Sequence, residues 1–426
     1  MNIIYLAAGA GQMHCGACAR DIALVRGLIR RGHDVQVIPL YTPLKLEGDA
    51  PVPVAPVFLG GINAYLQQKS RFFRRLPPAL DRILDSRRLL NYVSRFAIST
   101  RASELGEMTV SVLAGADGLQ KKELRRLIDH LKSQGAPDAF VITNTLLSGL
   151  APELKRHFSV PVLCGLQGED DFVRSMLPVH QERALELMHQ NAAEIDLFIA
   201  PGPWYAELMA DFLRIPPQSI RIVRTALDVD SYAWEGPRPR EPFTLGYLSV
   251  IAPRKGLDIL VEAFGVLVRE QGRDVRLRVA GRVLSDDFFR SLQAKIGHWK
   301  LSDRFEHLGE VDMASKQQFL RSCSAFCLPS RFPETRALAV MEALAAGVPV
   351  VVPATGTFPE LLERVGGGLL FPSGDADALA AQVARLHDDP QVADEMGRSA
   401  AKAISEHHNV DLAVDEMLAV LREVVG

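Results

Sequence analysis

Short apolar runs alternate with amphipathic segments along most of the chain. Residues 3–8 (IIYLAA) are apolar, residues 18–31 (CARDIALVRGLIRR) carry apolar side chains at helical spacing, and after Gly32 a second apolar run covers residues 34–40. Such runs predict buried strands, and the 3.6-residue spacing predicts helices that cover them. Strand, helix and strand in regular alternation predict right-handed crossovers and therefore a parallel sheet.

The alternation continues to about residue 202 and then starts again after a turn-rich linker, YAWEGPRPREPF, at residues 232–243. A linker of this composition is typical of a domain boundary. We therefore predict two Rossmann-like, doubly wound α/β domains that face each other across a cleft. The expected division is an N-terminal domain at 1–235, a C-terminal domain at 236–405, and a C-terminal helix at 406–426 that packs back toward the N-terminal domain.

The segment 66–101 interrupts the alternation. It carries nine basic side chains against only Asp81 and Asp85, interleaved with Phe, Leu and Ile residues. A basic amphipathic helical insertion of this kind can lie on an anionic membrane surface. The alternative, which we favour, is a solvated arginine-rich face over a packed apolar stripe, or a wall for an anionic acceptor.

Composition limits the class of protein. The 426 residues contain 48 Lys and Arg against 51 Asp and Glu, which argues against nucleic acid as the main partner because phosphate binding needs a basic excess. Five cysteines are too few for a secreted disulfide framework. No basic stretch precedes the first apolar run, and no apolar run approaches the ~20 residues of a membrane span. We expect a cytoplasmic protein, with peripheral membrane contact as the alternative location.

The stretch GQMHCGACARD, residues 11–21, follows the first expected strand and combines Cys15 and Cys18 with His14 and two glycines. Three interpretations are open: a metal clip, a redox pair, or a loop that cradles a ligand. A zinc site would need four ligands, for which Cys164 is the further candidate. A thiol pair at a helix N-terminus would favour the thiolate.

The second half contains two segments with candidate chemistry. In residues 330–360, Glu334 and Glu342 flank a helix expected to begin near Arg336 and Ala337. The eight-residue separation predicts that the two carboxylates lie on related helical faces if the first turn is regular. Free N–H groups at a helix start suit a diphosphate, and nearby carboxylates suit sugar and ribose hydroxyls.

The other segment, GYLSVIAPRKGLDIL at 246–260, places Arg254, Lys255 and Gly256 between an expected strand and a helix. Two cations would thus lie at the C-terminal end of the domain's first strand. As an alternative, both belong to a solvated turn.

These segments resemble the donor-binding domain of family-4 retaining glycosyltransferases, which have the GT-B fold. The resemblance rests on an ordered series of motifs between residues 243 and 390: APRKGLDILVEAF, FEHLGEV, LPS, the pair Glu334 and Glu342, EALAAGVPVV, TGTFPELL and GGGLLFPSGDADALA. It extends more weakly over the whole chain.

The resemblance implies a retaining enzyme of the hexosyltransferase type that takes its sugar from a nucleotide-diphosphate donor, with a UDP-sugar favoured. It implies that Lys255 holds the donor diphosphate, Glu342 the nucleotide ribose and Glu334 the transferred sugar. Backbone N–H groups of Arg336, Ala337 and Leu338 would take the distal phosphate. Arg254 would add a second positive charge. We expect no metal or other cofactor, because these groups would stabilise the leaving diphosphate.

The chain departs from the family pattern at several positions. Val250 stands where the family usually has an arginine, and further differences lie at 225–226, 281–283 and 356–357. In the first half, Asn144 and Gln167 replace two family histidines, so sugar or acceptor contact by these amides is expected but proton transfer is not.

Four other positions in the first half complete the expected site. Gly16 takes the place of the second glycine in the family's first-strand loop, where it lets the backbone approach the donor phosphates, and Cys15 takes the place of the first. Asp170 and the adjacent Asp171 could bind acceptor hydroxyls, or form a helix cap or surface turn.

The sequence is also compatible with other functions. A catalytically weakened nucleotide-sugar binder is motivated by Val250 and Gln167, and a metal- or redox-dependent variant of the fold by Cys15 and Cys18. A phosphorylase of the same fold is a further alternative, although the lysine that would anchor its pyridoxal cofactor cannot be located. The sugar, the acceptor and the oligomeric state are not determined by the sequence.

Overall fold

The computed structural model describes residues 1–8, 16–41, 53–54, 57–59, 68, 102–232, 236 and 241–426, with side chains from Asp21 and Leu105 onward in the two helices that begin at 16 and 102. The chain forms two compact units. Unit 1 comprises Met1–Ala226 together with Val410–Gly426, and unit 2 comprises Leu227–Asn409. The division falls at Ala226, earlier than the expected linker at 232–243, and the last helix belongs to unit 1.

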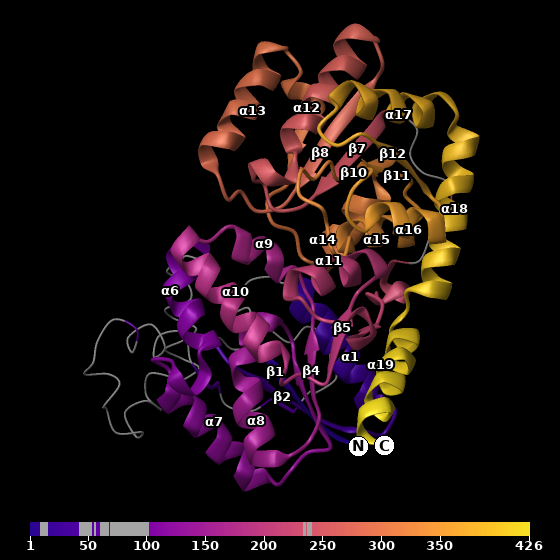
Figure 1. Cartoon of the computed structure of the whole chain (residues 1–426). Coiled ribbons are helices and arrows are strands. Elements are labelled where there is room, and N and C mark those ends of the chain that lie inside the picture. Colours follow the sequence, from indigo (N-terminus) through magenta and orange to yellow (C-terminus); the bar gives the residue numbers. More distant parts are fainter. Residues whose placement is uncertain are drawn as a thin grey trace. The chain divides into compact units, whose positions relative to one another are not determined.

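Unit 1 is built on a six-stranded parallel sheet (Figure 1). The strand order is β2-β1-β3-β4-β5-β6. Its strands are β1 (Asn2–Ala7), β2 (Asp34–Pro39), β3 (Ala139–Ile142), β4 (Val162–Gly165), β5 (Leu197–Ala200) and β6 (Ile220–Ile222). Its α-helices are α1 (Gly16–Arg30), α6 (Ala102–Leu113), α7 (Lys121–Gln134), α8 (Ala151–Phe158), α9 (Glu169–Arg174), α10 (Pro178–Ala192), α11 (Pro203–Leu213) and α19 (Val410–Val425). Three short 3-10 helices complete the described part: η1 (Gly115–Asp117), η2 (Thr145–Leu150) and η3 (Pro217–Ser219).

Both faces of this sheet are buried, because successive residues of a strand point to opposite sides. Ile4 and Phe140 belong to the apolar cluster on one face, whereas Ile3 and Val141 belong to the cluster on the other. Residues of α1 and α19 complete the second cluster, and these two helices pack against each other. Strands buried on both faces read as continuous apolar runs, which is why the sequence pattern located β1 to β5. The short and partly buried β6 lies beyond residue 202, where the expected alternation ended.

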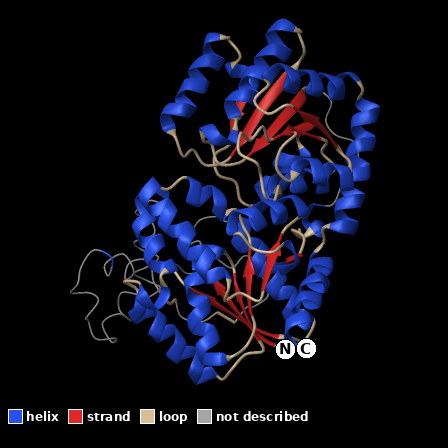
Figure 2. Ribbon diagram, viewed as in Figure 1, coloured by secondary structure: helices blue, strands red, loops and turns tan. Residues whose placement is uncertain are grey.

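Unit 2 repeats the architecture with strand order β12-β11-β10-β7-β8-β9, again all parallel. Figure 2 shows helices flanking its sheet. The strands are β7 (Phe243–Leu248), β8 (Val275–Ala280), β9 (Phe305–His307), β10 (Ala325–Cys327), β11 (Val350–Pro353) and β12 (Gly368–Phe371). The α-helices are α12 (Leu257–Gly265), α13 (Asp286–His298), α14 (Met313–Arg321), α15 (Leu338–Ala345), α16 (Phe358–Val365), α17 (Ala376–Asp388) and α18 (Pro390–His407). The remaining turns are η4 (Val229–Tyr232), η5 (Pro253–Lys255), the π-helical η6 (Val266–Glu270) and η7 (Ser302–Arg304). The predicted doubly wound α/β class is therefore confirmed for both units.

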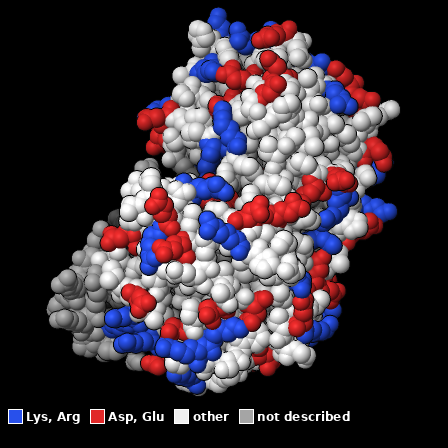
Figure 3. All heavy atoms as spheres, in the orientation of Figure 1, with Lys and Arg blue, Asp and Glu red and all other residues white. Residues whose placement is uncertain are grey.

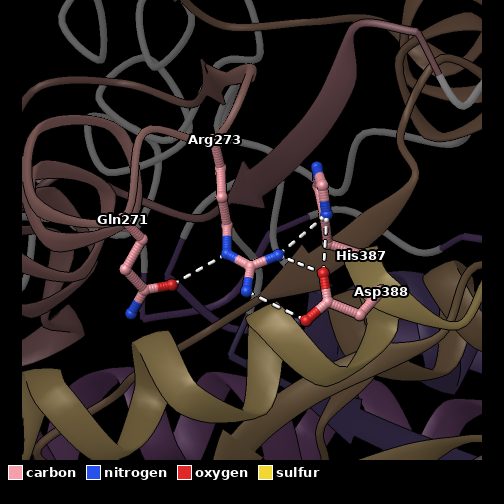
Figure 4. Close-up of polar contacts among 4 residues, drawn as sticks. All are labelled: Gln271, Arg273, His387 and Asp388. Atoms are coloured by element: carbon pink, nitrogen blue, oxygen red, sulfur yellow. Dashed lines mark hydrogen bonds and ion pairs between the residues drawn. The ribbon is translucent and has the colours of Figure 1, made fainter.

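A polar cluster at the amino end of β8 ties two segments of unit 2 together (Figure 4). The Arg273 guanidinium donates to both carboxylate oxygens of Asp388, the last residue of α17, and to the Gln271 side chain at 2.8 Å. His387 lies 3.0 Å from the same guanidinium. Because Arg273 precedes β8, the cluster lies at the opposite end of the sheet from the loops that follow the strands. We interpret it as structural.

The face drawn in Figure 3 is not dominated by charge of one sign. Basic and acidic side chains are interspersed on it. Across the part of the chain that the structure describes, no helix is both long and apolar enough to cross a membrane. Apart from Gln68, the basic segment 66–101 lies outside the described residues, so its two interpretations stay predictions.

Candidate active site

Two loops of unit 2 meet at the point where its strand order reverses. β7 is the first strand of the unit, β8 lies on one side of it and β10 on the other. In an open parallel sheet, ligands bind beyond the carboxyl ends of the strands at such a switch point. The loop after β7 carries Arg254 and Lys255, and the loop after β10 carries Glu334.

The structure brings Lys255 and Glu334 together. The Lys255 ammonium donates to Oε1 of Glu334 at 2.5 Å, and the two side chains are only 14% and 16% exposed. Gly256 makes this approach sterically feasible. Its φ is +70°, and an added Cβ would lie 1.8 Å from the carbonyl oxygen of Pro329. Close contact between the two loops therefore depends on a residue without a side chain.

Two further contacts order the loop after β7. The backbone N–H of Arg331 donates to the carbonyl oxygen of Arg254 at 2.9 Å, and the Arg254 guanidinium lies 5.9 Å from the centroid of the Phe332 ring. Beneath the loop, the Tyr247 hydroxyl donates to the carbonyl oxygen of Val250 at 3.3 Å. Burial raises the pKa of Tyr247, so its phenol stays a donor. Arg254 and Lys255 thus lie side by side in one ordered loop.

Helix α15 begins one residue after Ala337, whose φ of 51° places it in the left-handed region. A residue other than glycine at positive φ is strained, and such strain concentrates at functional sites. Leu338 is the first helical residue, so Arg336 and Ala337 lie in the turn that leads into the helix. The expected helix start is thus near its observed position.

The expectation that Glu334 and Glu342 share related helical faces is wrong. The residues from Glu334 to Ala337 are not helical, because the chain reverses through the left-handed Ala337 before α15 begins. Glu334 therefore lies in the loop against Lys255, whereas Glu342 lies within α15 and has other partners. The two carboxylates are positioned by a loop and a helix separately.

Glu342 is held by two side chains from distant parts of unit 2. Its Oε1 accepts a hydrogen bond from the Tyr232 hydroxyl at 2.8 Å and one from the Lys316 ammonium at 2.5 Å. Lys316 belongs to α14, and Tyr232 ends η4. The ammonium also lies 5.5 Å from the centroid of the Tyr232 ring. The exposed fractions of the Lys316 and Glu342 side chains are 18% and 13%.

In unit 1, Asn144 and Gln167 follow the neighbouring strands β3 and β4. Asn144 caps η2, where its side-chain oxygen accepts from the N–H of Leu146 at 3.1 Å. The Gln167 amide nitrogen donates to Oδ2 of Asp21 at 3.0 Å. Asp21 is a buried residue of α1, and it lines a cavity of about 30 Å³ together with Gln167 and Thr143. An ionised carboxylate only accepts, so the amide must turn its nitrogen toward Asp21.

The buried carboxylate of Glu169 connects the backbones of the two loops that carry these amides. One oxygen of Glu169 accepts from the N–H of Thr145 at 3.1 Å and from its hydroxyl at 2.8 Å, and the other accepts from the N–H of Gln167 at 2.5 Å. Burial raises the pKa of Glu169, although these hydrogen bonds oppose the shift. Glu169 thereby fixes the loop after β3 to the loop after β4.

Asp170, an expected acceptor contact, is also buried. Its carboxylate accepts from the Tyr205 hydroxyl at 2.8 Å. The residue that caps α9 is Gly168, so Asp170 is neither the cap nor part of a surface turn. Asp171 is half-buried in the same helical turn. Acceptor binding by either carboxylate stays a prediction.

The glycine-rich loop lies largely outside the described residues. Gly16 is the first residue of α1, whereas Cys15 and His14 precede the described segment and the side chain of Cys18 is not described. The metal and redox interpretations of this loop therefore stay untested. Within the described ranges, no group of three or more His, Cys, Asp or Glu side chains is placed to hold a metal ion.

The structure places four side chains beside the candidate residues that the sequence pattern did not indicate: Asp21, Glu169, Tyr232 and Lys316. No local motif distinguishes these residues. Lys316 and Asp21, for example, occur on amphipathic helices, where charged side chains are common. Glu169 immediately precedes Asp170 and Asp171, the aspartates that the sequence indicated as candidate acceptor contacts. A run of three acidic residues shortly after a buried strand was the available signal, because a buried carboxylate there must find donors.

Two family models match the chain on either side of the division between the units. The model for glycosyl transferases group 1 matches residues 228–403, and the model for the glycosyl transferase 4-like domain matches residues 22–226. The chain belongs to the family-4 glycosyltransferases with the GT-B fold. Within this family, the match to the group 1 model contains Lys255, Glu334 and Glu342.

The chain shows distant similarity to curated glycosyltransferases over part of its length. It is 31% identical over 177 residues to the phosphatidyl-myo-inositol mannosyltransferase of Mycolicibacterium smegmatis, which covers 41% of this chain and 43% of that protein. It is 28% identical over 266 residues to the amylovoran biosynthesis glycosyltransferase AmsK of Erwinia amylovora, which covers 60% of this chain and 62% of that protein. These matches span less than two thirds of either relative.

Solved structures share the fold over nearly the whole chain. Sucrose-phosphate synthase from Thermosynechococcus elongatus superposes with a TM-score of 0.74 at 17% identity, covering 99% of both chains. HepE from Anabaena, solved with UDP-glucose, superposes with a TM-score of 0.68 at 16% identity, also covering 99% of both chains. At these identities the likeness establishes the fold alone.

Proposed function

We propose that this protein is a retaining glycosyltransferase that moves a sugar from a nucleotide-diphosphate donor to an acceptor hydroxyl. The observation that carries the proposal is the Lys255–Glu334 contact at the switch point of unit 2, where open α/β sheets bind ligands. Glu342 on the adjacent α15 and membership in the family support it.

In this proposal, Lys255 and Arg254 bind the donor diphosphate together with N–H groups of residues 336–338. A diphosphate is a stronger partner for the Lys255 ammonium than one carboxylate, so donor binding would draw that ammonium from Glu334. Glu334 would then accept from a hydroxyl of the transferred sugar. Glu342 would accept from the ribose. A UDP-sugar is the favoured donor, and the UDP-glucose complex of the structural relative HepE supports that choice.

The reaction proposed is a front-face displacement. The bond between the anomeric carbon and the diphosphate oxygen breaks, a bond to the acceptor oxygen forms on the same face, and the acceptor proton passes to a diphosphate oxygen. Lys255 and Arg254 would stabilise the charge that develops on the leaving group, a role that needs no divalent cation. Asn144 and Gln167 would contact hydroxyls without moving protons, since amides do not titrate.

The first test is nucleotide release. The protein is incubated with UDP-, GDP- and ADP-sugars, with and without a chelator, and the free nucleoside diphosphate is measured. We expect release from one nucleotide class, undiminished by the chelator. Proton NMR of the transferred sugar then reports the anomeric configuration, and inversion would contradict the retaining mechanism.

Val250 favours a second candidate, a nucleotide-sugar binder with weakened catalysis, because an apolar side chain occupies the position of a family arginine. This candidate predicts donor binding without release. Calorimetric binding of the same donors with no nucleotide released over hours would support it, whereas release in proportion to enzyme concentration would exclude it.

A further inference from the structure

Glu342 has an unusual environment for a residue that would bind a neutral ribose. Two donors end on the same carboxylate oxygen, the hydroxyl of Tyr232 and the ammonium of Lys316. Tyr232 is only 4% exposed, so its hydroxyl cannot easily move away. The three side chains come from three elements, η4, α14 and α15, and Tyr232 and Lys316 lie 110 and 26 residues before Glu342.

This arrangement has two physical consequences. A carboxylate oxygen that already accepts two hydrogen bonds has little capacity for a third, so the other oxygen, Oε2, becomes the acceptor for a ligand. The two donors also prevent rotation of the carboxylate about its last torsion. An orienting partner behind a ligand-binding group generally contributes to affinity through geometry, without touching the ligand itself.

Lys316 also compensates charge. A partly buried carboxylate close to a diphosphate site would repel the ligand, and an ammonium bonded directly to it offsets that repulsion. Lys316 is held over the Tyr232 ring, which restricts the ammonium to the side of Glu342 that faces Tyr232.

We propose that Lys316 and Tyr232 are positioning residues of the donor site, which orient Glu342 so that its Oε2 accepts from the ribose hydroxyls. The inference rests on the proposed function, because it requires a nucleotide donor at Glu342. It assigns to Lys316 and Tyr232 of this chain the orientation of the glutamate that the family uses to bind the ribose.

The test measures whether the two side chains act through the ribose hydroxyls. Dissociation constants for UDP and for 2′,3′-dideoxy-UDP are measured by calorimetry on the full chain and on Lys316→Met and Tyr232→Phe. We expect each substitution to weaken UDP binding about five- to tenfold. Tyr232→Phe should not change the affinity for the dideoxy ligand, which lacks the hydroxyls. Lys316→Met should weaken the dideoxy ligand less than UDP, because it also removes the charge that offsets repulsion of the diphosphate. Lys316→Arg should restore part of the UDP affinity.

Lys295→Met is the matched control. Lys295 pairs with Glu262 and lies 5.6 Å from the centroid of the Trp299 ring, so it has the same combination of contacts outside the candidate site. This variant should bind both ligands as the unmodified protein does.

Equal weakening of both ligands by Lys316→Met and Tyr232→Phe would reduce the pair to structural support and overturn the inference. Unchanged UDP affinity in both variants would also overturn it while leaving the proposed function intact. If the unmodified protein binds none of UDP, ADP and GDP, the inference and the proposed donor fall together.

Discussion

The two units place different chemistry beyond the ends of similar sheets. In unit 2 the candidate groups are paired charges, Lys255 with Glu334 and Lys316 with Glu342, each partly open to solvent. In unit 1 two of the candidate groups are neutral amides. The buried carboxylate of Asp21 holds Gln167, and the backbone N–H of Leu146 donates to Asn144. Charge pairs that a ligand can rearrange suit an anionic donor. Amides fixed by buried partners suit selection among neutral hydroxyl groups.

The largest effect on nucleotide release should come from removing the Lys255 ammonium of unit 2. Lys255→Met removes the ammonium that would stabilise the leaving diphosphate, and we expect nucleotide release to slow about 10²- to 10³-fold. Gln167→Ala in unit 1 should lower the rate far less, because it would remove the one proposed hydroxyl contact together with the hydrogen bond to Asp21. Lys402→Met, at a side chain that is 78% exposed, is the control. Equal losses for Lys255→Met and Gln167→Ala would erase the proposed division of roles.

In unit 1 the expected effect is on stability, because the buried carboxylate of Glu169 holds two loops together. Glu169→Ala leaves the N–H groups of Thr145 and Gln167 without their acceptor, at an expected cost of about 3 kcal/mol in the free energy of unfolding. Glu186→Ala breaks a half-exposed pair with Arg183 and should change it by less than about 0.5 kcal/mol. Urea titration of both variants measures the difference. A small effect of Glu169→Ala would mean that the two loops of unit 1 hold their positions without this carboxylate.

In unit 2, the loop geometry should depend on Gly256. Gly256→Ala adds left-handed strain and a clash with the carbonyl oxygen of Pro329, and we expect a loss of about 2–4 kcal/mol. Gly272 has a similar φ of +65° with nothing within 4 Å of an added Cβ, so Gly272→Ala isolates the strain at about 1 kcal/mol. Equal thermal shifts for the two variants would show that the close approach beside Lys255 has no energetic weight.

The smallest effect concerns a charge pair of unit 2 outside the candidate site. The hydrogen bond from Arg273 lowers the pKa of Asp388 to about 2. The ionised form is thus favoured in the native state, so its stabilisation is present above the unfolded pKa of about 4 and is lost as the pH falls toward 2. The side chain is 58% exposed, which limits the contribution to about 0.3–0.5 kcal/mol.

Unfolding of Asp388→Asn and the unmodified protein is compared between pH 7 and pH 2.5. The stability difference should shrink on acidification, and a difference that is independent of pH would contradict the assigned pKa.

The sequence by itself determined most strands of the two parallel sheets, since strands that are buried on both faces read as apolar runs, whereas β6 and β12 are only partly buried. It also located Lys255, Glu334 and Glu342, because local segments carry them in a characteristic order. Tertiary structure decided their partners. A left-handed Ala337 separates the two glutamates, Gly256 brings Lys255 to one of them, and Lys316 reaches the other from a different helix. Asp21 and Glu169 acquire their roles only on folding, because Asp21 accepts from Gln167 in the loop after β4 and Glu169 accepts from Thr145 after β3. Periodicity reports which face of an element is buried, whereas a hydrogen-bond partner distant in the sequence is specified only by how the elements pack.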